Sequence, residues 1–225
     1  QVVNLTTTAL SYLSTRGVSG FSTSQIAALS TTQVSNLGST SVKVLSVVQL
    51  GAMETADLAV LGSKSLLTST QVRGLTTAQL VTLTTDALAS LNTSAVAGLT
   101  TSQIVALTTT QAADLTTTAV KALTTAQIAA METVDVASLN TTNIAALSSV
   151  QVQALTTRQI IGLTTAQISA LNTTTLQALT TKQIAALETE DVSLLGSTKV
   201  TYLSSTQLRA LNTAQVAQLN SDQLT

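Results

Sequence analysis

The regularly spaced carboxylates lie in three eight-residue units, each with Glu at the second position and Asp at the fifth. The pairs are Glu54 and Asp57, Glu132 and Asp135, and Glu188 and Asp191. A carboxylate pair can bind Ca²⁺, but Ca²⁺ takes six to eight oxygen ligands, and no Asp- and Gly-rich calcium loop surrounds these pairs. Acidic residues also suit the N-terminal end of a helix, where they complement its dipole. We therefore predict that these pairs are structural and that the chain has no metal ligands.

Other residue types that carry chemistry are absent or scattered. The chain contains no His, Cys or Trp, which removes imidazole bases, thiolate nucleophiles and the commonest zinc ligands. No Gly-rich phosphate loop is present. Tyr12 and Tyr202 occupy equivalent places in the repeat described below, where we expect them to fill grooves. We predict no catalytic or cofactor-binding residues, no cofactor, and no enzymatic activity.

The charge balance argues against nucleic acid as a partner, and the length of the apolar runs argues against a membrane span. Only 8% of the residues are charged, and the formal net charge is −1. Nucleic-acid binding requires a basic stripe, which this sequence lacks. The apolar runs stay below the roughly 18 residues of a transmembrane helix, so we expect no membrane span. The chain carries no signal peptide and no initiator Met, and we expect any targeting segment to lie outside it.

An eight-residue repeat, here called the octad, fills the whole sequence. Leu123–Ala130, with the sequence LTTAQIAA, shows its pattern: Leu, a capping residue, Thr or Ser, any residue, Gln, an aliphatic residue, any residue and a small residue. The pattern has 28 starts, and one octad, at residues 61–66, lacks positions seven and eight. We predict one continuous array over residues 1–225 that is a segment of a longer array.

The spacing within the octad predicts a short helix. Position two is Thr, Ser, Asn or Gly in all but three octads, and these residues cap helix N-termini. The motif Thr-x-x-Gln is a capping box, and positions one and six form its hydrophobic staple, so Leu123 should touch Ile128. A continuous α-helix is excluded because an eight-residue period would carry the Leu row around the helix. We expect a helix of roughly six residues followed at once by the next N-cap.

The distribution of charge predicts which positions face the core. All 19 charged residues avoid positions one, three and six. We therefore expect positions one and six to form the core, position four to face water, and the Thr at position three to lie on the inner side. The small residues at position eight predict close approach of neighbouring coils.

These patterns predict an all-α fold, a solenoid or superhelix of very short helices with one helix per octad. The alternative is a β-solenoid, because Thr, Val and Ile favour strands. The Ala and Gln content and the capping-box spacing favour the helical form.

The run Leu163–Leu171, with the sequence LTTAQISAL, resembles the octapeptide-repeat regions of very large bacterial exported proteins. Those proteins are of the haemagglutinin type or of the haem-utilisation-or-adhesion type. The resemblance covers the entire chain and implies a secreted or surface-attached structural protein. A haem role does not carry over, because no His or Cys ligand is present and both Met residues occupy core position one.

Three functional hypotheses follow. The first is a structural module, the stalk of a surface adhesin or the subunit of an extracellular filament, that associates side by side because its surface carries little charge. The second is a binding solenoid whose exposed positions recognise a protein or a glycan, although the outliers Arg73, Lys121, Arg158 and Arg209 are scattered. The third is an ice-binding Thr array, which requires the Thr rows to be exposed.

Overall fold

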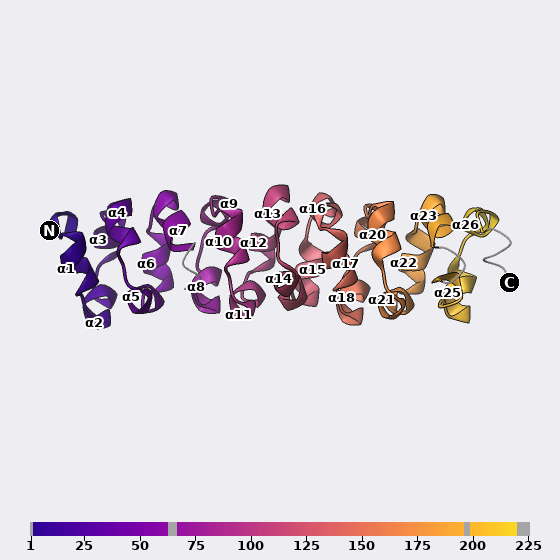
Figure 1. Cartoon of the computed structure of the whole chain (residues 1–225), viewed down its shortest axis with the longest axis horizontal. Coiled ribbons are helices and arrows are strands. Elements are labelled where there is room, and N and C mark those ends of the chain that lie inside the picture. The colour runs from indigo at the N-terminus through magenta and orange to yellow at the C-terminus, as the bar shows by residue number, and fades with distance from the viewer. Residues whose placement is uncertain (1, 63–66, 196–198, 220–225) are drawn as a thin grey trace. The chain divides into compact units, whose positions relative to one another are not determined.

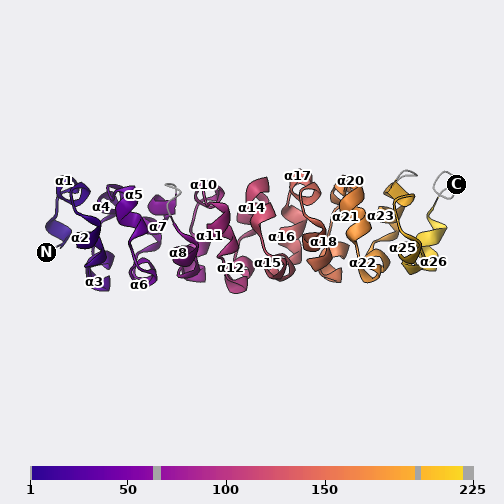
Figure 2. The ribbon, with the colours of Figure 1, turned by 90° about the horizontal axis from the view of Figure 1, so that it is seen from below.

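The computed structural model describes residues 2–62, 67–195 and 199–219. Every element assigned in this part of the chain is helical. By its internal contacts the chain divides into two compact segments, residues 1–122 and residues 123–225. Both are arrays of short helices with one helix per octad, as the sequence predicts, and the β-solenoid is excluded for the described residues. The helices follow one another along each segment (Figures 1 and 2).

The N-terminal segment begins with a 3₁₀ helix and continues with helices that mostly span five residues. They are η1 (Val2–Asn4), α1 (Thr7–Ser11), α2 (Thr15–Ser19), α3 (Thr23–Ala27), α4 (Thr31–Ser35), α5 (Ser39–Lys43), α6 (Val47–Gly51), α7 (Thr55–Gly62), α8 (Ser69–Arg73), α9 (Thr77–Val81), α10 (Thr85–Ala89), α11 (Thr93–Ala97), α12 (Thr101–Val105), α13 (Thr109–Ala113) and α14 (Thr117–Ala122).

The C-terminal segment has the same design, with helices of five or six residues. They are α15 (Thr125–Ala130), α16 (Thr133–Ser138), α17 (Thr141–Ala145), α18 (Ser149–Ala154), α19 (Thr157–Ile161), α20 (Thr165–Ala170), α21 (Thr173–Ala178), α22 (Thr181–Ala186), α23 (Thr189–Leu194), α25 (Ser205–Ala210) and α26 (Thr213–Ala217).

The predicted capping box is present in the described octads that have Gln at position five. In α15 the Thr124 hydroxyl accepts a hydrogen bond from the Gln127 backbone N–H at 3.2 Å, and the Gln127 side-chain Oε1 accepts from the Thr124 backbone N–H at 2.7 Å. The helix ends at Ala130, and the extended backbone of its C-cap, Met131 (φ −56°, ψ 141°), leads directly to the next N-cap. Because a helix this short is unstable alone, packing between octads must hold it in place.

Positions one and six form the core, as predicted. Leu123 and Ile128 are 4% and 1% exposed. Every described residue at position four is exposed, from Thr8 to Ala214. This confirms the predicted division of the octad into buried anchors and a solvent-facing position.

The prediction for position three is wrong. No described residue at this position is buried, and Thr125, Thr141 and Thr165 are among those that are exposed. Position three lies at the surface because it is the first helical residue, beside the exposed N-cap. Its lack of charge reflects contact with the next coil: a Cβ added to Gly98 would come 2.7 Å from Ser69 Cβ, and one added to Gly74 would come 2.5 Å from Val47 Cβ.

Those two contacts join position eight of one octad to position three of the octad three places earlier, which confirms close approach at position eight. Helices three places apart pack together throughout each segment, for example α8 on α11 and α11 on α14. In the C-terminal segment α15 packs on α18, which packs on α21. The helices therefore stack in coils, each made of more than one octad.

Candidate functional site: the hydrogen-bond ladder between coils

A buried hydrogen bond from position five links each coil to the one before it. The Gln159 side chain is 1% exposed. Its Nε2 donates to the Ile128 carbonyl at 2.9 Å and to the Met131 carbonyl at 2.8 Å. Its Oε1 accepts the Thr156 backbone N–H at 2.7 Å and so closes the capping box of its own helix. One amide thus satisfies backbone groups in two coils, which is what a buried polar side chain requires.

The same bonds recur along both segments, and we call them the inter-coil ladder. In most cases Nε2 reaches a position-six carbonyl 31 residues earlier and a position-one carbonyl 28 residues earlier. Its glutamines are Gln33, Gln49, Gln71, Gln79, Gln103, Gln111, Gln151, Gln159, Gln167, Gln183, Gln207 and Gln215. Three octads contain 24 residues and four octads contain 32. The ladder separations of 28 and 31 residues lie between these two values, so one turn contains between three and four octads.

The ladder continues past the shortened octad. Residues 63–66 of the phase slip predicted at 61–66 lie outside the described residues. Gln71 donates to the carbonyls of Val42 and Leu45, which lie 29 and 26 residues earlier. Gln79 likewise reaches Leu50 and Met53. Both separations are two residues shorter than elsewhere, yet the bonded positions remain six and one. The slip therefore preserves the pairing between coils.

Lys199 occupies position five of its octad and also donates across the coils, since its Nζ bonds the Ser169 carbonyl, 30 residues earlier. Burial lowers the pKa of this amine below its usual value of 10.5. The ammonium group of Lys199 and the side-chain amide of the ladder glutamines differ in charge, but both have N–H donors. Position five is therefore a place where the preceding coil presents acceptors.

The three acidic octads place a carboxyl group at this donor position. Asp57, Asp135 and Asp191 are 2%, 1% and 1% exposed. Glu132 and Glu188, at their N-caps, make no side-chain capping bond. Asp191 accepts a hydrogen bond from the Glu188 backbone N–H, which is the acceptor half of the capping box. In this octad Asp therefore takes the place of Gln as the acceptor in the box.

Burial dominates the electrostatics of two of these acids. It raises the pKa of Asp191 above its ordinary 3.8, with a smaller contribution from Glu188 and Glu190, whereas the Glu188 N–H opposes the shift. Burial also raises the pKa of Asp57, where a hydrogen bond from the Thr31 side chain opposes the shift and Glu54 adds to it. Within the described residues, no cluster of three or more His, Cys, Asp or Glu could hold a metal ion.

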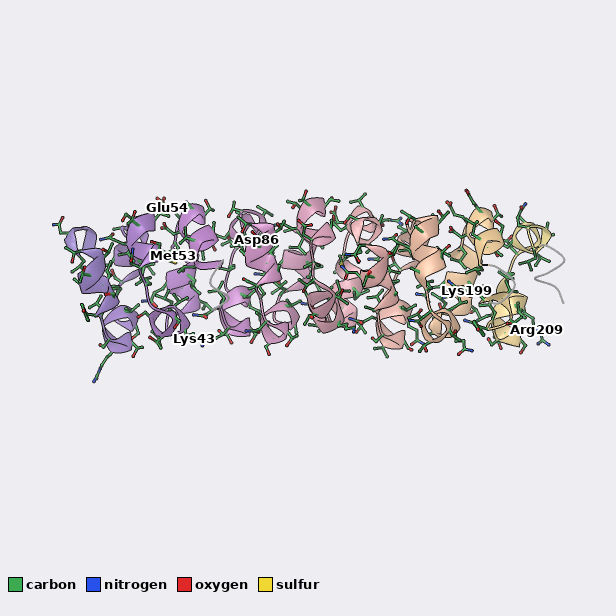
Figure 3. The ribbon with its side chains drawn as sticks, in the orientation of Figure 1. Lys43, Met53, Glu54, Asp86, Lys199 and Arg209 are labelled. Atoms are coloured by element: carbon green, nitrogen blue, oxygen red, sulfur yellow. The ribbon has the colours of Figure 1, made fainter. Side chains whose placement is uncertain are left out.

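The remaining candidate residues lie apart from one another on the surface. Arg73, Lys121, Arg158 and Arg209 are exposed on four different helices. Figure 3 shows Arg209, with Lys43 and Glu54, at the outside of the ribbon.

Tyr12 does not fill a groove, contrary to expectation, because its side chain is 84% exposed. Tyr202 is half-buried.

Among the helices that the structure describes, none combines the length and the hydropathy needed to cross a bilayer.

Comparison with known proteins supports the repeat. Three segments match the family described as the ALTTAQ repeat: residues 2–40, 128–165 and 162–197. The six letters of that name occur in this chain as Ala122–Gln127, which runs from position eight of one octad through the capping box of the next. No curated protein matches the chain. The match shows a repeat region built on this motif.

Sequence reasoning missed the ladder, although one feature could have revealed it. A capping box accepts Glu as readily as Gln at its third helical position. Position five nevertheless contains no Glu in any octad, while Gln dominates. That choice indicates a side chain that donates as well as accepts, as the amide of Gln does and the carboxylate of Glu does not.

Proposed function

We propose that this chain is a structural, non-catalytic repeat protein that forms the stalk of a surface adhesin or the subunit of an extracellular filament. The inter-coil ladder carries the proposal. Each coil holds the next through buried anchors and through a buried amide, so coils can be added without a new kind of contact. Stability in such arrays comes from interfaces between nearest neighbours.

Two further observations support an assembly role. Position four is exposed throughout the described octads, and its residues are mostly uncharged. A surface with a formal net charge of −1 brings little electrostatic repulsion to side-by-side contact. The resemblance to octapeptide regions of exported bacterial proteins supports an extracellular location.

Negative-stain microscopy and light scattering of the purified chain test this proposal. We expect elongated particles, and at higher concentration bundles or fibres. Compact globular particles at all concentrations would contradict the stalk and filament roles. Location is tested separately by treating intact cells that produce the protein with an external protease. Full protection of the repeat region would contradict exposure at the cell surface.

Ice binding is a second candidate, favoured by the exposure of the Thr residues at position three. Position-two hydroxyls act as helix caps, as Thr124 shows, so this hypothesis relies on the Thr residues at position three. Thermal hysteresis of the purified chain decides the matter, and a freezing point equal to the melting point would end this hypothesis.

Recognition of a protein or a glycan is the third candidate. The exposed basic residues could contribute to it, but they are spread over α8, α14, α19 and α25. Retention of the chain on an array of surface glycans, lost on replacing one of these residues, would favour it over a purely structural role.

A further inference from the structure

The donor requirement at position five has a consequence for the buried acids. An ionised carboxylate has four acceptor sites and no donor, whereas a protonated carboxyl group has one O–H donor. Gln, with its Nε2, and Lys, with its Nζ, both meet the carbonyls of the preceding coil as donors. An ionised Asp would instead bring a negative charge to those oxygens.

Asp191 shows the mismatch most clearly. The ladder separations of 31 and 28 residues place it opposite the carbonyls of Ile160 and Leu163, in the same segment. The Ile160 carbonyl already accepts the Leu163 N–H at 3.2 Å. The Asp191 Oδ2 atom is buried without a hydrogen-bond partner. An ionised Asp191 therefore has no donor for the carbonyls that a glutamine would bind at this ladder position, whereas a protonated carboxyl group has one.

We propose that Asp191 is a protonation-controlled link between coils. With a neutral carboxyl group it donates to the preceding coil as Gln does, and with an ionised group it weakens that contact. Asp57 has the same position and faces Ile26 and Leu29 by the same separations. There the Thr31 hydroxyl donates to the carboxylate, so the weakening on ionisation is smaller.

The surroundings of both acids contain little to stabilise the ionised form. Asp191 lies on α23, which packs on α20 and α26, and neither of these helices contains a titratable residue. The Lys199 ammonium group bonds to α20 at Ser169. Glu188 and Glu190, on the same octad, add negative charge. Asp57 lies on α7, which packs on α4, α9 and α10, and the titratable residue on these helices is the exposed Asp86.

The direction of the pH effect follows from linkage. The pKa of Asp191 in the folded chain is raised above its ordinary 3.8, so between the two values the folded chain binds more protons than the unfolded chain. Stability then falls as pH rises through this window. The contact is strongest below about pH 4, and it is weakened once the pH exceeds the folded-state pKa. This is the reverse of the usual loss of stability in acid.

Thermal melts of the full chain followed by circular dichroism test the proposal, with Asp191→Gln restoring the amide. We expect Asp191→Gln to raise the melting temperature at pH 7.5, and this gain to shrink at pH 4. Asp57→Gln should show the same trend with a smaller gain. Asp86→Asn, at the exposed position four, is the matched control and should give no pH-dependent gain.

A carboxyl-carbon NMR titration gives a direct measurement on the unaltered chain. Asp191 should titrate above pH 3.8. A midpoint at or below that value, as expected if a buried water bridges an ionised carboxylate to the carbonyls, would overturn the proposal. A gain from Asp191→Gln that is equal at pH 4 and pH 7.5 would overturn it as well. Neither result depends on the cellular role of the array.

Discussion

At the scale of single residues, the glutamine at position five bonds with two coils at once. Its oxygen accepts from the N-cap of its own helix, and its nitrogen donates to the previous coil. A side chain with both a donor and an acceptor suits such a place, because burying either backbone group unpaired costs about 1–3 kcal/mol. The side-chain amide at position five therefore stabilises both the cap of its own helix and the contact with the previous coil.

Helix α18 provides a matched test, since it contains the buried Gln151 and the exposed Gln153. We expect Gln151→Glu to lower the free energy of unfolding at pH 7.5 by about 1–3 kcal/mol, because an ionised Glu keeps the capping acceptor but cannot donate to the Leu123 carbonyl. Gln153→Glu should change it by less than about 0.5 kcal/mol. Urea unfolding of both variants measures the difference, and equal effects would refute the donor role.

At the scale of the helix, the octad combines a cap, two core anchors and an outward position. Ile128 and Ala126 of α15 lie on different faces of the helix: the first is 1% exposed and the second is exposed. We expect Ile128→Asp to cost about 3–5 kcal/mol, because an unpaired carboxylate replaces a core side chain. Ala126→Asp should be tolerated. If both variants melted at the same temperature, the assignment of faces would be wrong.

Contact between helices also limits side-chain size at position eight. A Cβ on Gly98 would come 2.7 Å from the Ser69 carbonyl oxygen, so Gly98→Ala should destabilise the chain by about 1–3 kcal/mol. Gly51 is the control, because a Cβ there meets only an ordinary contact of 3.9 Å with the Gly74 oxygen. Gly51→Ala should stabilise α6 by about 0.5–1 kcal/mol. Thermal melts that show the same sign for both variants would contradict the close approach.

At the scale of the whole chain, the pairing between coils depends on which octad positions meet and not on a fixed number of residues between them. The short octad lacks positions seven and eight, and Gln71 still finds its partners, at separations of 29 and 26 residues. The ladder therefore still forms when the residues at positions seven and eight of an octad are missing. It should not tolerate the loss of the anchors themselves.

Two deletions within one octad test this. Removal of residues 153–154, at positions seven and eight, reproduces the natural slip and should leave a cooperative melting transition near that of the parent chain. Removal of residues 151–152 deletes the ladder amide and a core anchor and should cost about 2–5 kcal/mol. Circular dichroism during heating measures both. Unfolding of the first variant alone would contradict the tolerance that we infer.

The sequence determined the local design because its physical causes lie within a single octad. Capping bonds span three residues, as from Thr124 to Gln127, and the alternation of Leu123, Ala126 and Ile128 shows which face is apolar. The helical class, the N-caps, the core anchors and the exposed position four were all predictable from these short spacings.

Tertiary structure decided which octads meet. The partner of Gln159 lies 28 to 31 residues away, and an identical motif in every octad cannot indicate which copy that is. The number of octads per turn, the exposure of Thr125 and the donor-poor position of Asp191 all depend on how one coil packs on the last. That packing is set by the fit between helices three places apart, which a repeated local pattern leaves open.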